Sequence, residues 1–334
     1  MNAPPQTPAL SVATSVLNGE RHLAAAIESV LAQDFDDFEF LLLDDGSHDR
    51  SRAIAEHYAA RDPRIRVIAR ENRGLVASLN QLFEEARAPL VARFDADDIC
   101  APDRFSRQMS FLAANPDHGV VGSAIAYIDD HGAAAGNPPV THPTDHAALS
   151  ANLEDGPLLC HSAVMVRRDL VLAAGGYRPA YLHAEDYDLW LRLSGMTRMA
   201  NLPERLLSYR VSENQVSTRH MIAQARHAAI AWRAHMLRQQ GRPDPTDGLA
   251  TLPALDRIDA LLGPGSAAYV RRRVVDRALF APAALAGEGW DALMGHIADT
   301  GAQPRLWRVA GRLLRAGKPF HAVRAAAALA GIAA

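Results

Sequence analysis

Short apolar runs alternate with amphipathic helical patterns over roughly the first two hundred residues of the chain. The apolar runs have the length of β-strands and cover residues 10–14, 38–43, 65–68 and 89–92, the last in a strand expected to end at Asp95. Between them, apolar residues recur at helical spacing over residues 23–31, 50–60 and 77–86. This alternation is typical of a mainly parallel sheet with helices on its faces. The sequence therefore predicts an α/β fold for this region.

The pattern changes twice further along the chain. Strands are predicted over 120–124 and 160–166, a helix over 184–194, and a mobile Gly-, Ala- and Pro-rich connection over 132–143. Beyond Ser217 strand patterns vanish, and alanine and arginine dominate. We therefore expect two domains, an α/β domain over residues 1–216 and an α-helical extension over residues 217–334.

Composition limits the function classes. The chain has 334 residues, 49% of them hydrophobic and 22% charged, with a formal net charge of −3. This is ordinary for a soluble globular protein, and the net charge argues against nucleic acid as a partner. The two cysteines, Cys100 and Cys160, have no paired spacing, which speaks against a disulfide framework or a cysteine zinc site. No signal peptide or membrane-spanning run is visible, so a cytoplasmic location is expected.

Acidic residues follow two of the predicted strands directly. Asp95, Asp97 and Asp98 come after one strand, and Asp44 with Asp45 after another. Open α/β sheets bind ligands at the carboxyl ends of their strands. The two outer carboxylates of Asp-x-Asp can share one divalent ion, and oxygen ligands suit Mg²⁺ or Mn²⁺ better than zinc. Each cluster, taken alone, also suits an ordinary acidic turn that caps the next helix.

Six motifs in a fixed order make the region from about Ala9 to Val216 resemble the family-two glycosyltransferases. They are Ser11-Val12-Ala13-Thr14, Asn18-Gly19-Glu20, Leu43-Asp44-Asp45-Gly46-Ser47, Glu71-Asn72-Arg73-Gly74-Leu75, Phe94-Asp95-Ala96-Asp97-Asp98 and Ala184-Glu185-Asp186-Tyr187-Asp188-Leu189-Trp190. The resemblance implies the GT-A fold, a Rossmann-like nucleotide-binding sheet flanked by helices. It also implies an inverting enzyme that uses nucleotide-sugar donors, of the bacterial type that builds surface polysaccharide or lipopolysaccharide.

The resemblance also implies roles for individual residues. Mn²⁺ or Mg²⁺ would bind to Asp95 and Asp97, with Asp95 leaning toward the ribose, and would stabilise the charge of the departing diphosphate. Asp98 is expected to cap the following loop. The expected substrate-binding residues are Thr14, Asn18, Glu20, Asp44, Asp45, Arg73, Asp95, His161 and Glu185.

Glu185 and Asp186 occupy the family's position for the catalytic base. Inverting transfer needs a base opposite the leaving group, where it takes the proton of the acceptor hydroxyl. We expect Asp186 in this role, because Leu189, Trp190 and Leu193 at helical spacing would bury one face of the helix and hold its first turn. The alternative is that Glu185, Asp186 and Asp188 only complement the positive end of a helix.

The chain departs from the family after Tyr209-Arg210. Many relatives place there a histidine that approaches the diphosphate or the metal, whereas this chain continues with Val211-Ser212. A third metal ligand from this segment is therefore not expected.

The C-terminal extension carries an arginine stripe. Arg305, Arg308, Arg312 and Arg315 fall at helical spacing, and the apolar residues between them are Leu306, Trp307, Val309, Leu313 and Leu314. The pattern suits a helix that lies on an anionic membrane, and equally a helix packed against a core. The expected partners are a nucleotide-sugar donor, a glycan or lipid-linked acceptor, and peripherally the inner face of the cell membrane.

Two other functions compete with sugar transfer. A haloacid-dehalogenase-type phosphatase also places Asp-x-Asp after a strand, but its motif expects Thr or Val where Ile99 stands, and it leaves Asp44-Asp45 and Glu185-Asp186 unexplained. A non-catalytic nucleotide-sugar-binding protein would be expected to lack Asp186 or one member of the Asp-x-Asp pair. Asp186 and both members of the Asp-x-Asp pair are present. The comparison with each alternative therefore favours a transferase.

Overall fold

The computed structural model describes residues 7–136, 142–211 and 219–332. The chain divides into two compact units, one made of Met1–Arg178 with Leu189–Glu213 and the other of Pro179–Asp188 with Asn214–Ala334. The boundary predicted between residues 216 and 217 lies outside the described residues.

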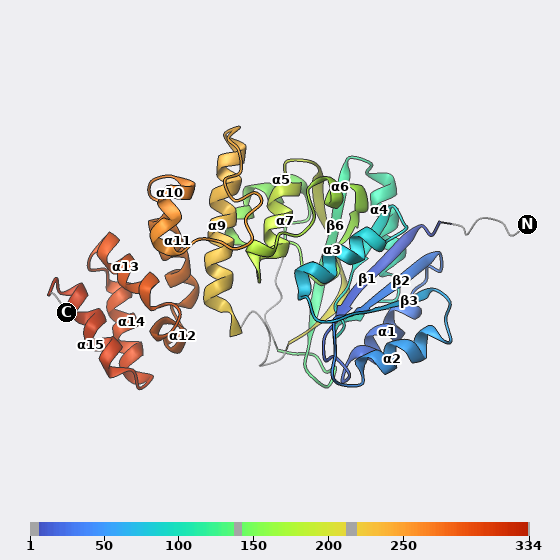
Figure 1. Ribbon diagram of the computed structural model, residues 1–334, viewed down its shortest axis with the longest axis horizontal. Coiled ribbons are helices and arrows are strands. Elements are labelled where there is room, and N and C mark those ends of the chain that lie inside the picture. The colour runs from blue at the N-terminus through green and yellow to red at the C-terminus, as the bar shows by residue number, and fades with distance from the viewer. Residues whose placement is uncertain (1–6, 137–141, 212–218, 333–334) are drawn as a thin grey trace, which may run out of the picture. The chain divides into compact units, whose positions relative to one another are not determined.

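The first unit is built on one eight-stranded sheet with the order β3-β2-β1-β4-β7-β6-β8-β5 (Figure 1). Strands β1 to β4 pair in parallel, as do β6 and β8, whereas β7 and β5 are antiparallel to their neighbours. The predicted α/β fold with a mixed, mainly parallel sheet is confirmed. The strands are β1 (Leu10–Val16), β2 (Phe38–Asp44), β3 (Ile65–Ala69), β4 (Leu90–Arg93), β5 (Ile99–Cys100), β6 (His118–Ile128), β7 (Met165–Arg167) and β8 (Arg198–Arg210).

Helices cover both faces of the parallel half of the sheet. The chain passes from β1 through α1 (Leu23–Leu31) to β2, and then through α2 (Ser51–Ala59) to β3. Each new strand is added on the same side of the one before it in the sheet. It then returns through α3 (Leu75–Glu85) to β4 on the other side of β1. Because such crossovers are right-handed, α1 and α2 cover one face and α3 covers the other, as Figure 1 shows. The remaining helices of this unit are α4 (Arg104–Ala114), α5 (His146–Ala151) and α6 (Arg168–Ala173), with most of α7 (Glu185–Leu193).

The two-sided cover explains why the central strands are mostly apolar and almost completely buried. Every residue of β2 is buried, and β1 is buried except for partly exposed Ser15. The one polar pair inside these strands is satisfied, because the Ser11 hydroxyl donates to Glu39 at 2.7 Å and accepts the Ala88 N–H at 3.1 Å. These contacts fix the two strands against the turn that precedes β4.

Two expectations about the later strands need correction. Residues 160–166 do not form one strand, because a 3₁₀ turn over His161–Ala163 precedes the short β7. The turn brings the Ser162 hydroxyl to the end of β4, where it accepts the Asp95 N–H at 3.0 Å. Strand β8 was not predicted, since Pro203 and its exposed neighbours break the apolar alternation beside a register shift in the β6–β8 pairing.

The second unit is helical, as expected for the extension. Its longest helix is α9, and α11 packs against both α9 and α13 while α14 packs against α15. Among the described residues, no helix combines the length and the apolarity that a membrane crossing needs. The helices are α9 (Met221–Gln239), α10 (Ile258–Leu262), α11 (Ser266–Ala278), α12 (Pro282–Ala286), α13 (Trp290–Thr300), α14 (Pro304–Arg315) and α15 (Pro319–Leu329).

Helix α14, which carries the arginine stripe, is a packed helix. Leu306, Val309 and Leu313 are buried within the unit, so they are not surface residues. Two of the four arginines also face inward, because Arg305 pairs with Asp276 at 2.5 Å and Arg312 donates to the Leu279 carbonyl at 2.8 Å. The outer side of α14 therefore consists of Arg308 and Arg315, together with Trp307 and Leu314, which are 44% and 59% exposed.

Candidate active site

The carboxyl ends of β1, β2 and β4 meet at one edge of the sheet. Asp44 is the last residue of β2 and pairs in register with Val16, the last residue of β1. On the other side of β1, Arg93 ends β4 opposite Ala13 and leads directly into the acidic residues. The structure thus brings Thr14, Asp44 and the Asp95–Asp98 segment to the same edge, as expected for a ligand site.

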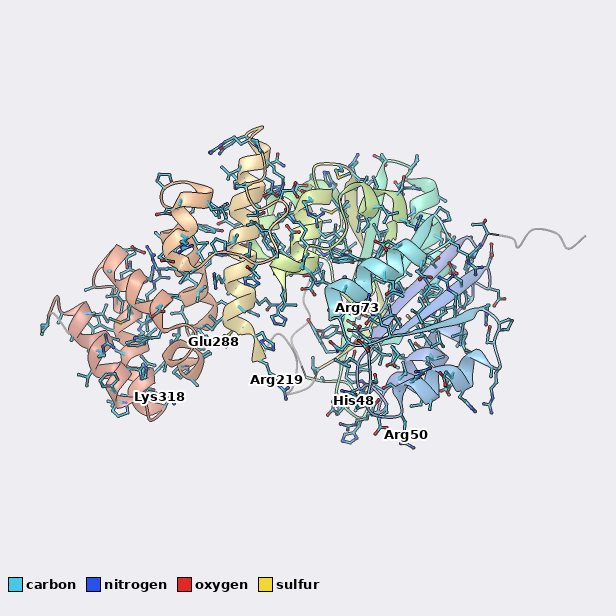
Figure 2. All side chains as sticks on the ribbon, in the orientation of Figure 1. His48, Arg50, Arg73, Arg219, Glu288 and Lys318 are labelled. Atoms are coloured by element: carbon cyan, nitrogen blue, oxygen red, sulfur yellow. The ribbon has the colours of Figure 1, made fainter. Side chains whose placement is uncertain are left out.

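Asp45 organises the loop that enters α3. Its Oδ1 accepts the Arg70 Nε–H at 2.9 Å and the Arg73 N–H at 3.1 Å, and its Oδ2 accepts the Gly74 N–H at 2.8 Å. Gly74 has φ +86°, a value that favours glycine. The side chain of Arg73 is exposed on this loop (Figure 2). Asp45 therefore supports the segment that presents Arg73.

Asn18 and Glu20 join the loop after β1 to the loop after β2. Asn18, at φ +54°, accepts the His48 N–H through its side-chain oxygen at 2.9 Å. Glu20 accepts the Arg50 N–H at 3.0 Å and forms an ion pair with its guanidinium at 3.1 Å. Figure 2 shows His48 and Arg50 on the loop that enters α2. On β1 itself, the buried Thr14 hydroxyl has no hydrogen-bond partner among the described residues.

The three carboxylates after β4 form a tight cluster. Asp95, Asp97 and Asp98 can each offer an oxygen within 4.8 Å of the others. Desolvation and the charge of Asp95 raise the pKa of Asp97 to about 6. Burial, with the charges of Asp95 and Asp97, raises the pKa of Asp98 to about 8. The charge of a bound cation would oppose both shifts, because it favours the ionised carboxylates.

Asp98 has a different place from the one expected. It is 1% exposed and does not cap the following loop, because its Oδ1 accepts the Arg210 N–H at 2.8 Å. The Arg210 guanidinium in turn donates to the Asp97 carbonyl at 2.7 Å. The other carboxylate oxygen of Asp98 is buried and has no hydrogen-bond partner among the described residues. An all-carboxylate cluster with such an unmatched oxygen fits Mn²⁺ or Mg²⁺.

Arg93 belongs to this site, although the sequence patterns did not single it out. It ends β4, is 4% exposed and pairs with the Asp95 carboxylate. The available signal was an arginine inside the otherwise apolar run of residues 89–94. Buried arginines are rare unless an acidic partner accompanies them.

His161 is held as a neutral ring. Its Nε2 forms a 2.9 Å hydrogen bond with the Tyr177 hydroxyl, and its ring lies edge-on to Trp190 with 6.0 Å between the centroids. Burial and the charge of Arg93 lower its pKa well below the ordinary value. A substrate contact by His161 stays a prediction.

Glu185 and Asp186 begin helix α7. Leu189, Trp190 and Leu193 are buried, which confirms the predicted apolar face of this helix. Of the acidic residues in the first turn, Glu185 and Asp188 are buried, whereas Asp186 is partly exposed. Because Pro179–Asp188 belongs to the second unit, the pairing of Asp186 with the acidic cluster stays a prediction.

Comparison with known proteins gives one family. Residues 11–172 match the family model described as glycosyl transferase family 2. The chain is 33% identical over 214 residues to the amylovoran biosynthesis glycosyltransferase AmsE of Erwinia amylovora, an alignment that covers 63% of this chain and 79% of AmsE. It is 29% identical over 206 residues to the O-antigen biosynthesis glycosyltransferase WbnJ of Escherichia coli, covering 60% of this chain and 79% of WbnJ.

Two solved structures have a similar fold. The mannosyltransferase PcManGT from Pyrobaculum calidifontis, in complex with GDP-Man and Mn²⁺, has a TM-score of 0.56 at 17% identity and covers 97% of this chain and 88% of its own. S. aureus TarS 1-349, in complex with UDP-GlcNAc, has a TM-score of 0.58 at 15% identity, and the match covers 97% of this chain and 92% of the TarS chain. At these identities the comparison supports the fold.

Proposed function

The chain belongs to glycosyl transferase family 2 and has the GT-A fold, and we propose that it moves a sugar from a nucleoside-diphosphate sugar to an acceptor hydroxyl with inversion. The observation that carries the proposal is the three-carboxylate cluster at the sheet edge where β2 also ends in Asp44. AmsE and WbnJ are named for amylovoran and O-antigen biosynthesis, which supports a role in making surface polysaccharide or lipopolysaccharide.

The donor would lie along the ends of β1, β2 and β4. We assign nucleotide contacts to Thr14, whose buried hydroxyl has no partner among the described residues, to Asp44 and to the exposed Arg73. Asp45, Asn18 and Glu20 complete the proposed donor set, and their contacts hold the loops that surround it. PcManGT and TarS are named as complexes with GDP-Man and with UDP-GlcNAc, which supports a nucleotide-sugar donor of either base.

The acidic cluster would hold the cation. Asp95 and Asp97 are the assigned metal ligands, and Asp95 also reaches toward the donor ribose. A bound Mn²⁺ or Mg²⁺ would supply a Lewis acid beside the departing diphosphate. The protein's own part is to hold three carboxylates close together, which is unfavourable without a cation.

Asp186 is the proposed general base, and His161 and Glu185 are proposed substrate contacts. The partial exposure of Asp186 suits the role of base, since a base must reach the acceptor hydroxyl. Glu185 and Asp188 are buried. In this proposal residues 1–216 form the catalytic domain, and residues 217–334 form an extension.

The extension is proposed to touch the inner face of the cell membrane, where a lipid-linked acceptor would lie. Residues 300–334 contain six arginines and lysines and no aspartate or glutamate. The exposed side chains there combine Arg308, Arg315 and Lys318 with Trp307 and Phe320. Cations beside exposed aromatic residues suit an anionic lipid surface.

A donor panel followed by a transfer assay tests the enzyme proposal. Purified protein is screened against UDP-, GDP-, dTDP- and ADP-sugars with Mn²⁺ by ligand-induced thermal shift. The stabilising donor is then offered with lipid and glycan extracts as acceptors. Asp186→Asn should keep donor affinity while transfer falls by at least about a hundredfold, because the amide cannot accept the proton. Donor binding by the native protein without transfer to any extract would favour a nucleotide-sugar-binding protein instead.

A further inference from the structure

Arg93 is a buried cation at the centre of the candidate site. Its guanidinium pairs with the Asp95 carboxylate, whose own side chain is 33% exposed. Arginine is protonated at every ordinary pH, and the carboxylate of Asp95 lies directly against this buried guanidinium. Arg93 therefore keeps its positive charge, and this charge sits against one of the three carboxylates of the cluster.

A second buried arginine in the same region shows what a purely structural role looks like. Arg104 donates to the Gln108 side chain, to Cys100 Sγ and to the carbonyls of Arg93 and Val164. Arg93, in contrast, has a buried Nε–H without a hydrogen-bond partner among the described residues. In the described part of the chain, its guanidinium pairs with the Asp95 carboxylate, whereas that of Arg104 donates to neutral acceptors.

The charge of Arg93 acts on more than its direct partner. The carboxylates of Asp97 and Asp98 can bring oxygens within 4.8 Å of those of Asp95, so the charge of Arg93 acts on all three. The three carboxylates with Arg93 carry a formal charge of about −2 when all are ionised, in place of −3. A divalent cation therefore gains less from this cluster than from three carboxylates alone.

We propose that Arg93 is a positioning residue that makes cation binding at the Asp95–Asp98 cluster conditional on the donor diphosphate. Arg93 pairs with the Asp95 carboxylate and cancels part of the negative potential of the three carboxylates. The cluster alone therefore binds Mn²⁺ weakly. A nucleoside diphosphate adds negative oxygen ligands, and cation and donor then bind together. The inference rests on the proposed function, in which this cluster holds the cation that accompanies a nucleotide-sugar donor.

The test measures Mn²⁺ affinity without relying on catalysis. Free Mn²⁺ is followed by electron paramagnetic resonance, with and without saturating UDP or GDP. The native protein should bind Mn²⁺ at least about tenfold more tightly with nucleotide than without it. In Arg93→Met, the affinity for Mn²⁺ alone should rise by at least about tenfold, so the advantage given by the nucleotide shrinks. Arg93→Lys retains the charge and should behave as the native protein does.

The chain offers a matched control in Arg70. It pairs with Asp45 at 2.8 Å, both side chains are nearly buried, and the pair lies at the end of the neighbouring strand β2. Arg70→Met removes a buried cation of the same kind from a different carboxylate. It should leave the affinity for Mn²⁺ alone unchanged. An equal rise in both Met variants would show a general charge effect and overturn the role of Arg93.

The remaining outcomes separate this inference from the proposed function. If the native protein binds no Mn²⁺ even with nucleotide, the cation site itself is wrong. If nucleotide-dependent binding is present but both Arg93→Met and Arg93→Gln bind Mn²⁺ alone as weakly as the native protein, only the role of Arg93 is wrong. Arg93→Gln keeps polar N–H donors without the charge, and it decides the question should circular dichroism show that Arg93→Met does not fold. Equal native affinity with and without nucleotide also overturns the inference.

Discussion

Raising the pH should destabilise the cation-free protein through Asp98. The pKa of Asp98 in the folded protein is raised to about 8, from the ordinary value of 3.8 that applies to the unfolded chain. The folded state therefore holds a proton that the unfolded state has already lost. This contribution to stability is complete below the unfolded pKa and disappears as pH rises through about 8, because unfolding then costs progressively less.

The best window to observe this effect is pH 7 to 8. Histidines of lowered pKa, such as His161, act with the opposite sign, but they are the same in the native protein and in Asp98→Asn, so the comparison of these two proteins cancels their effect. Between pH 7 and 8 the proton on Asp98 falls from about nine-tenths to about half occupancy. The corresponding loss is about 1 kcal/mol, or roughly 2–4 °C in the Tm of a domain of this size.

The assay is thermal unfolding followed by circular dichroism at pH 7.0, 7.5 and 8.0 in the presence of chelator. Asp98→Asn can still accept the Arg210 N–H but cannot titrate, so its Tm should fall less than that of the native protein. Asp62→Asn is the control, since Arg64 lowers the pKa of Asp62 and this carboxyl stays ionised throughout the window. Saturating Mn²⁺ should flatten the native curve, because the cation replaces the proton. Parallel native and Asp98→Asn curves would refute the reasoning.

Three further perturbations have defined outcomes. Asp97→Asn should remove the gain in nucleoside-diphosphate affinity that Mn²⁺ gives, as measured by calorimetry; an unchanged gain would move the cation elsewhere. Asp45→Ala should weaken donor binding by roughly tenfold, because the Arg70–Gly74 loop loses the acceptor that holds it, and an unchanged Kd would make Asp45 an ordinary turn residue. Replacing Arg308, Arg315 and Lys318 with Gln should weaken binding to phosphatidylglycerol vesicles by on the order of a hundredfold at low salt, with little effect on neutral vesicles. The control variant, which should bind as the native protein does, replaces exposed arginines elsewhere on the same unit, Arg242, Arg257 and Arg272.

The parallel half of the fold could be predicted because its strands are buried on both faces. A buried strand of this kind leaves a continuous apolar run, which β2 shows most clearly. Strand β8 left no such run, since exposed residues around Pro203 interrupt it, and its pairing with β6 joins segments about eighty residues apart. Local periodicity carries no information about pairings of that kind.

The same limit applies to the candidate site. Asp95 and Asp97 could be found from their spacing and from the strand before them, because both signals are local. The contact of Asp98 with Arg210 joins residues that are 112 positions apart, so the sequence suggested a nearby loop cap instead. Arg93 was visible as a charged residue in an apolar run, but its partner became clear only when the turn after β4 was seen in three dimensions.

The contact between Asp98 and the end of β8 also has a consequence for the order of biosynthesis. A nascent chain that has reached residue 172, the end of the region that matches the family model, has Asp95, Asp97 and Asp98 but not the backbone N–H of Arg210. Until β8 is made and joins β6, three repelling carboxylates lack one of the groups that fix them. Fragments that end before β8 should therefore fail to acquire the cation, and a ribosome-stalled series of chain lengths, assayed with nucleoside diphosphate present, would show Mn²⁺ binding only after residue 210 has emerged.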